Sequence, residues 1–165
     1  MSIRRIQEFL DGNHVRYAVI CHSPAYTASE VAESVHIRGR TFAKVVIVAI
    51  DGRLALAVVP ATCEVDLSSL QDLTGVHDVR LAGETEFADR FQGCKLGTVP
   101  PFGNLFGVDT YVDRSLMKEE YIAFNAGTHT DVIVMSFEDY NHLVRAKFAH
   151  IAMPPINQRF RVATL

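Results

Sequence analysis

One segment constrains the fold more than any other: Phe42 to Ile50 (FAKVVIVAI), an apolar run with a single lysine, Lys44, near its start. Asp51-Gly52 follows it, and a second apolar run, Arg53 to Pro60 (RLALAVVP), comes next. Asp-Gly is a preferred pair for a tight hairpin turn that needs positive φ. The sequence therefore predicts two antiparallel strands. Because polar residues do not alternate with apolar ones, we expect a central hairpin with both faces covered.

Lys44 stands at the entrance of this buried strand, so its ammonium must either extend to water or meet an anion. Arg38 and Arg40 precede it, and no acidic residue occurs between His36 and Ile50. This pattern indicates a small positive field, although an ordinary solvated loop with two arginines fits it as well. The net charge is −3, so the chain as a whole is not built to coat nucleic acid, and any such contact should be local.

The rest of the chain alternates between helical and extended patterns. With 165 residues, 48% of them hydrophobic, it can bury a core, and we expect one domain over residues 1–165 with an extended tail from about residue 152. Apolar spacing and capping residues predict helices that begin at Ile3, after Thr27, after Asp66, before Phe87 and after Ser136. Further strands are predicted at Val15–Cys21, Val76–Leu81, Gly107–Val112, Tyr121–Asn125 and Asp131–Met135.

The three cysteines, Cys21, Cys63 and Cys94, are widely spaced and lack metal-ligand spacing. They predict neither a disulfide framework nor a zinc site, and we expect reduced thiols in a cytoplasmic protein without metal or cofactor. The adjacent Cys21-His22 pair is disfavoured as nucleophile and base, because neighbouring strand residues point to opposite faces. No stretch is long enough to cross a bilayer and no signal segment is evident, so no membrane partner is expected.

Two short motifs are not typical of a helix or a strand. Leu96 to Gly103 (LGTVPPFG) pairs prolines between glycines, which suits neither an ordinary helix nor a central strand. Such a loop can aim main-chain groups at a small ligand, but it can also simply connect two elements. Ala126 to His129 (AGTH) forms a second tight turn that ends in a histidine. A single histidine in a turn is often just exposed and polar.

Taken in order, FAKVVIV, LGTVPPFG and FNAGTHTDVIVMS resemble the YbaK/prolyl-tRNA synthetase-associated editing domain family, over about His22 to Val144. The resemblance implies an α+β fold with a mixed, mostly antiparallel sheet that forms a partly closed barrel, with helices packed outside. It also implies hydrolysis of the ester between a wrong amino acid and the 3′-terminal adenosine of a tRNA. The expected partners are therefore aminoacylated tRNA and, in trans, a synthetase.

The family's site residues map onto this sequence one by one. Lys44 matches the lysine that contacts the terminal nucleotide, and His129 matches the histidine of the GxH turn. Gly97 and Pro101 match the ends of the GxxxP loop, whose main chain holds the aminoacyl group. These four are the predicted catalytic residues. The predicted substrate-binding residues are Thr98, Val99, Pro100, Gly127 and Thr128.

The chemistry implied by the resemblance requires no metal, because an aminoacyl ester is already activated and fixed main-chain donors can stabilise the oxyanion. Because the chain extends little beyond the matched region, the resemblance implies a free-standing, trans-editing member. The motifs do not decide among alanine, cysteine, serine and threonine. Two alternatives stay open: a non-catalytic module that binds a nucleotide or a tRNA end, and a hydrolase of another small acyl ester or amide.

Overall fold

The predicted hairpin forms the centre of the fold. In the computed structural model, which describes residues 3–156, β2 (Ala43–Ile50) and β3 (Arg53–Pro60) pair antiparallel along their whole length. Asp51 and Gly52 make the turn with φ of 51° and 75°, which are values that a type I′ hairpin turn requires. The antiparallel pairing and the tight turn predicted from the sequence are confirmed.

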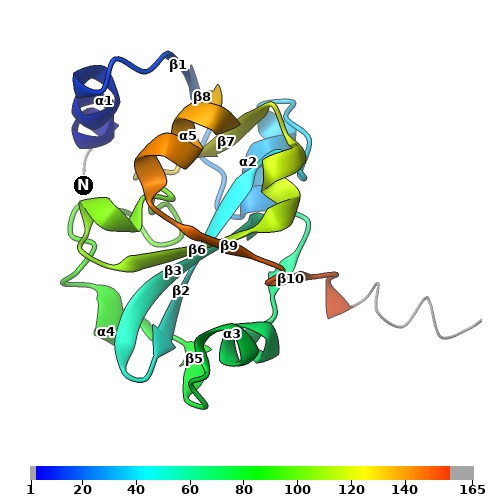
Figure 1. Cartoon of the computed structure of the whole chain (residues 1–165). Helices are drawn as coiled ribbons and strands as arrows, with labels where there is room; N and C mark the ends of the chain where they lie inside the picture. Colours follow the sequence, from blue (N-terminus) through cyan, green and yellow to red (C-terminus); the bar gives the residue numbers. More distant parts are fainter. Residues whose placement is uncertain (1–2, 157–165) are drawn as a thin grey trace, which may run out of the picture.

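The hairpin occupies the middle of a five-stranded sheet in the order β5-β2-β3-β6-β9 (Figure 1). β2 pairs antiparallel with β5, whereas β3 pairs parallel with β6, and β6 pairs parallel with β9. The outer strands are β5 (Val79–Leu81), β6 (Asp109–Asp113) and β9 (Lys147–Ala149). The hairpin is therefore central, as expected.

Both faces of this sheet are covered, because alternate residues of β3 enter different apolar clusters. Leu56 and Val58 pack with Phe102 and Phe124 in the larger cluster. Ala57 and Val59 face the other way and pack in a second cluster with Leu70 of the helix Leu67–Thr74. The continuous apolar pattern of β3 thus reflects burial on two sides.

A second sheet has three strands in the order β1-β8-β7, all antiparallel: β1 (Tyr17–Cys21), β8 (Asp131–Ser136) and β7 (Tyr121–Asn125). A parallel bridge between Phe42 and Ala123 connects it to the start of β2, and the Ala123 N–H donates to the Thr41 carbonyl over 3.1 Å. A third, two-stranded sheet joins β4 (Glu64–Val65) to β10 (Ala152–Met153).

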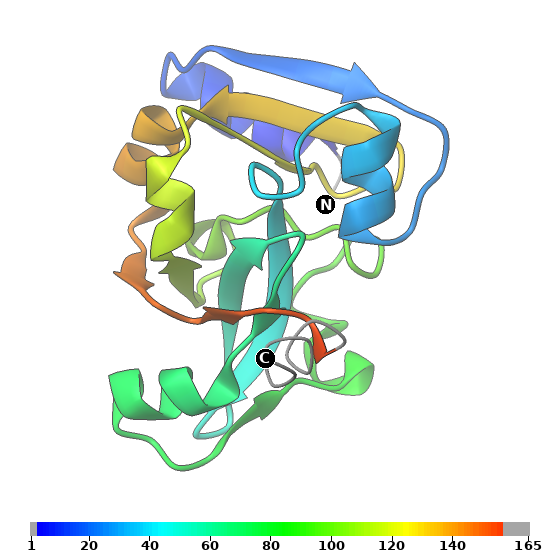
Figure 2. The same ribbon diagram turned by 90° about the vertical axis from the view of Figure 1, so that its right-hand side faces the viewer.

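The expectation of a partly closed barrel is not supported. The strands described in residues 3–156 form three separate sheets, and none of these sheets closes on itself (Figures 1 and 2). The physical reason lies at the junction of β2 and β7, where pairing stops after the single bridge at Phe42 and Ala123. The mixed, mostly antiparallel α+β character of the prediction is confirmed.

Most of the predicted helices are present with their predicted caps. Thr27, Asp66 and Ser136 each accept hydrogen bonds from main-chain N–H groups of the turn that follows. The predicted helix through Phe87 and Phe91 ends after one turn, although the two rings remain 6.3 Å apart edge to face. The helices are α1 (Ile3–Gly12), α2 (Ala28–Ser34), α3 (Leu67–Thr74), α4 (Glu84–Phe87), α5 (Phe137–Val144), and the 3-10 segments η1 (Gly103–Leu105) and η2 (Arg114–Lys118).

The predicted extended tail begins with β10, and its residues 157–165 lie outside the described part of the chain. No helix within residues 3–156 combines the length and the apolar character needed to cross a membrane.

Candidate functional site

The segment Gly97–Pro101, here called the Gly97 loop, is held at both ends. Gly97 has φ of 77°, a conformation that favours glycine. Thr98 is fully buried, and its hydroxyl and main-chain N–H both donate to the Lys95 carbonyl, over 2.6 and 3.1 Å. At the other end, the Tyr140 hydroxyl donates to the Pro101 carbonyl over 2.8 Å. These contacts fix the shape of the loop at both ends.

The segment Gly127–His129, here called the Gly127 turn, is stabilised by a carboxylate. Gly127 has φ of 91°. The Thr128 hydroxyl donates to the Asp131 carboxylate over 2.6 Å and accepts the Asp131 N–H over 3.1 Å. Burial tends to raise the pKa of Asp131, but hydrogen bonds from Thr128, Cys21 and Thr130 outweigh it, so the net pKa is lowered. Asp131 therefore favours its charged form, which fixes the turn.

The Gly97 loop and the Gly127 turn contact each other directly. The Gly127 N–H donates to the Thr98 carbonyl over 2.9 Å, and the Lys95 N–H donates to the Gly127 carbonyl over 3.1 Å. Between residues 3 and 156, the main-chain N–H groups of Val99 and His129 have no hydrogen-bond acceptor. This contact between the Gly97 loop and the Gly127 turn, here called the junction, joins two of the predicted site segments. The N–H groups of Val99 and His129 lie beside it as main-chain donors.

Asn125 adds a third contact to this junction. It ends β7 with only 9% of its surface exposed, and its Nδ2 donates to the Gly97 carbonyl over 3.4 Å. Its Oδ1 is buried and has no hydrogen-bond partner within residues 3–156. A buried acceptor without a partner costs free energy, so such groups often have a functional explanation. Asn125 was not predicted from the sequence; the available signal was a polar residue at the end of a buried strand.

Lys44 lies on β2 where two apolar clusters meet. Phe42, Lys44, Val46 and Val48 alternate along β2 and so share one face. Phe42 packs in the cluster next to α2, whereas Val46 and Val48 pack in the cluster next to α3. The lysine enters the boundary between the two clusters, which explains how a charged side chain is accommodated on this face.

The ammonium of Lys44 is partly buried and donates to the carbonyl of Cys63. Burial lowers the pKa of Lys44, and electrostatic interactions with Glu64 and Cys63 partly oppose this effect. Lys44 borders a cavity of about 510 Å³ together with Glu64 and Leu81. The positive field expected around Lys44 is reduced on one side, because Arg40 forms an ion pair with Glu119 at 3.4 Å.

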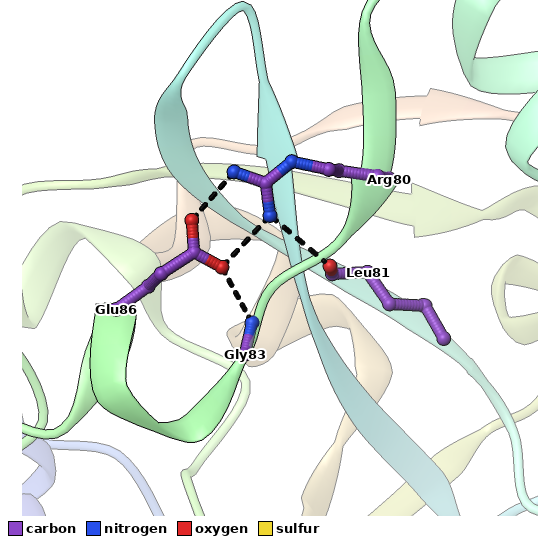
Figure 3. Close-up of polar contacts among 4 residues, drawn as sticks. All are labelled: Arg80, Leu81, Gly83 and Glu86. Carbon is purple, nitrogen blue, oxygen red and sulfur yellow. Dashed lines mark hydrogen bonds and ion pairs between the residues drawn. The ribbon is translucent and has the colours of Figure 1, made fainter.

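A second cavity, of about 210 Å³, is lined by Gly97 and Val99 together with Phe87 of α4. Figure 3 shows how α4 is held: Arg80 on β5 faces Glu86, and the two form hydrogen bonds of 2.8 and 2.5 Å. Neither this cavity nor the one at Lys44 includes His129. The prediction that Lys44, the Gly97 loop and the Gly127 turn belong to one site therefore stays a prediction.

Lys44 and Asn125 both follow the strand bridge between the two sheets. Phe42 is paired with Ala123 in the parallel sense, and Lys44 and Asn125 each follow this pair by two residues. Because alternate residues share a face, Lys44 lies on the same face of its strand as Phe42, and Asn125 lies on the same face of its strand as Ala123. Cys21 and His22, by contrast, have separate partners: Cys21 contacts Asp131 at 3.4 Å, and His22 contacts the Ser23 carbonyl at 2.6 Å.

The chain belongs to the aminoacyl-tRNA editing domain family, whose model matches residues 22–143. No curated protein is a significant match. Solved structures share the fold: one described as a hypothetical protein is 21% identical, with a TM-score of 0.81 over 90% of this chain and 99% of that one. Another, described as a candidate trans-editing enzyme for prolyl-tRNA synthetase, is 23% identical, with a TM-score of 0.77 over 92% and 96%.

The same fold also occurs inside a longer chain. A candidate signal transduction protein from Marinobacter aquaeolei VT8 is 20% identical, with a TM-score of 0.72 over 90% of this chain but only 30% of that one. At these identities the likeness to solved structures concerns the fold alone, whereas the family assignment rests on the sequence match.

Proposed function

We propose that this protein is an aminoacyl-tRNA deacylase that acts in trans on tRNA carrying a small, wrong amino acid. The observation that carries the proposal is the junction of the Gly97 loop and the Gly127 turn, which leaves the N–H groups of Val99 and His129 without acceptors inside residues 3–156. Membership of the editing domain family supports the reaction type. The similarity to a candidate trans-editing enzyme supports action in trans.

The reaction requires little more than positioning. A water attacks the ester carbonyl, the carbonyl oxygen becomes an oxyanion, and main-chain N–H groups such as those of Val99 and His129 stabilise its charge. The C–O bond to the ribose then breaks, the ribose oxygen takes up a proton, and the products are the free amino acid and uncharged tRNA. Because Thr98 and Tyr140 fix the Gly97 loop and Asp131 fixes the Gly127 turn, these donors need no reorganisation during the reaction.

Lys44 would hold the terminal nucleotide while the ester reacts. Its ammonium is a compact cation that can exchange the Cys63 carbonyl for a phosphate oxygen, a stronger, charge-assisted acceptor. In this proposal Gly97, Thr98, Val99, Pro100 and Pro101 surround the aminoacyl group, and Gly127, Thr128 and His129 close the other side.

A small amino acid fits the volume next to the loop. The cavity at Gly97 and Val99 measures about 210 Å³, below the roughly 300–1,000 Å³ of pockets that take drug-sized ligands. One methylene group changes binding by only about 1–3 kcal/mol, which is why synthetases need a second, hydrolytic selection step for small side chains. The substrate side chains to test are therefore those of alanine, cysteine, serine and threonine.

The test is incubation of the protein with Ala-, Cys-, Ser- and Thr-tRNA, each prepared on non-cognate tRNA, with release of the amino acid followed under single turnover. We expect rapid release of at least one of these amino acids and no acceleration for a large residue such as Phe-tRNA. Binding of the tRNAs without hydrolysis would replace the deacylase by a binding module of the same fold. Hydrolysis of simple acyl esters but not of the tRNA esters would indicate a different substrate class.

A further inference from the structure

An exposed aromatic ring lies against the histidine of the Gly127 turn. Tyr26, in the connection between β1 and α2, is 69% exposed. Its ring centroid is 4.8 Å from that of His129, with an angle of 55° between the rings. An exposed tyrosine is ordinary by itself. This one, however, places a second aromatic ring next to the ring of His129, which is a predicted site residue.

The main chain around Tyr26 is fixed although its side chain is exposed. The Ala25 N–H donates to the His129 carbonyl over 3.3 Å, so the connection is tied to the Gly127 turn. The Tyr26 N–H donates to the carboxylate of Glu30 over 3.3 Å, and the Glu30 N–H donates to the Thr27 hydroxyl over 3.1 Å. These contacts form the N-terminal cap of α2. The cap therefore holds the main chain of Tyr26 in place, while the ring of Tyr26 is exposed.

We propose that Tyr26 and His129 form a stacking platform for the base of the 3′-terminal adenosine of the tRNA, a proposal that rests on the proposed function. The acceptor end of a tRNA is single-stranded, and proteins commonly bind single-stranded bases by stacking them on aromatic side chains. His129 adjoins the junction where the ester would lie, and the terminal base is the part of the substrate nearest to that ester. The platform would thus place the ribose, and with it the ester, against the Gly97 loop.

Geometry favours a base over a protein partner at this position. The platform consists of two rings held by one main-chain hydrogen bond between Ala25 and His129, and the surrounding residues Ser23, Pro24 and Thr27 are exposed but not strongly apolar. A protein interface of ordinary size needs a broad apolar core, whereas one base needs only an accessible ring face. One nucleotide base therefore suits the size of this surface.

The experiment uses an uncharged RNA hairpin with the acceptor-stem sequence and a CCA end, in which 2-aminopurine replaces the terminal adenine. Its fluorescence falls when the base stacks, so the signal reports stacking directly and does not depend on hydrolysis. We expect quenching on binding to the wild-type protein. Tyr26→Ala should weaken binding about tenfold and abolish most of the quenching, since stacking on one aromatic ring contributes at about this level. Tyr26→Phe should retain both.

Tyr121→Ala is the matched control, because Tyr121 is also exposed, at 52%, but begins β7 at the end of that strand away from the Gly127 turn. It should bind the RNA and quench it as the wild-type protein does. Equal quenching by wild type and Tyr26→Ala, or binding by wild type without quenching, would overturn the platform. Because the RNA carries no amino acid, a failure of the deacylase assay would count against the proposed function alone.

Discussion

Gly127 donates its main-chain N–H to the carbonyl oxygen of Thr98 over 2.9 Å, which links the Gly127 turn to the Gly97 loop. The Gly127 carbonyl in turn accepts the N–H of Lys95 over 3.1 Å. Two hydrogen bonds on one residue make the turn and the loop a single unit. Any change that displaces Gly127 should therefore displace the main-chain donors on both segments.

Gly127→Ala tests this coupling. With φ of 91°, an alanine would be strained at this position by about 1–3 kcal/mol, and relief of the strain would shift the turn. We expect deacylation to fall at least about tenfold. The control is Gly52→Ala, which has φ of 75° in the β2–β3 turn and should lose comparable stability without losing activity. Equal activity losses in the two variants would mean that the effect of Gly127 is only one of stability.

Asn125→Leu tests whether the polar side chain at the junction is kept for function. Leucine has a similar size and removes the buried Oδ1 that lacks a partner, so the melting temperature should be unchanged or higher. The hydrogen bond to the Gly97 carbonyl is also lost, and we expect the single-turnover rate to fall about tenfold. A variant with a lower melting temperature and an unchanged rate would show that Asn125 serves only the fold.

Tyr140→Phe removes the hydroxyl that holds the far end of the Gly97 loop. Tyr140 is fully buried, and the burial raises its pKa well above the usual value, so the hydroxyl stays protonated as a donor to Pro101. The variant leaves the Pro101 carbonyl without its partner and should lose about 1–3 kcal/mol in urea unfolding. Tyr17→Phe, which loses a hydrogen bond to Asp11 at an exposed site, should change by less than about 0.5 kcal/mol. Equal losses would refute the anchoring role.

The Arg80–Glu86 pair predicts a pH dependence of stability. Hydrogen bonds from Arg80, and then from the Gly83 N–H, lower the pKa of Glu86 to about 2 (Figure 3). The unfolded-state pKa of a glutamate is about 4.3. Because the folded pKa is the lower one, the stabilisation is present above about pH 4.5 and is lost as the pH falls toward 2. The pair is exposed, so its contribution should also shrink at high salt.

The check on this pair is urea unfolding of wild type and Glu86→Gln across that pH range. The difference in unfolding free energy between the two proteins should be constant near neutral pH and should disappear toward pH 2. A difference that persists unchanged in acid would show that Glu86 acts through packing and not through its charge.

The hairpin and the helix caps could be predicted from the sequence because their signals are local. Asp51-Gly52 specifies the hairpin turn in which it lies. Thr27 caps α2 by accepting the N–H of Glu30, which is only three positions away. The barrel was wrong for a non-local reason: closure depends on how far β7 pairs with β2, and pairing stops after Phe42 and Ala123. The pattern of apolar residues in β2 and β7 does not indicate how many residues of the two strands pair.

In the candidate site, too, features with local signals were predicted and features that depend on distant contacts were not. The Gly97 loop and the Gly127 turn were found by their unusual composition and by resemblance to a family. Tyr26 was missed, because its contact with His129 joins residues about a hundred positions apart. The surroundings of Lys44 were missed too, since β4 and β10, which help to enclose its cavity, are strands of two residues without a readable pattern.

The central claim is that this chain hydrolyses aminoacyl-tRNA with Lys44 in its site, and one comparison tests it most directly. Single-turnover deacylation of Ala-, Cys-, Ser- and Thr-tRNA is measured for wild type, Lys44→Ala, Lys44→Arg and the exposed control Lys118→Ala. We predict a loss of about 100-fold for Lys44→Ala and a clear loss for Lys44→Arg, whose planar group cannot replace a compact ammonium, with Lys118→Ala unaffected. Equal rates for wild type and Lys44→Ala on the substrate that is cleaved would contradict the account.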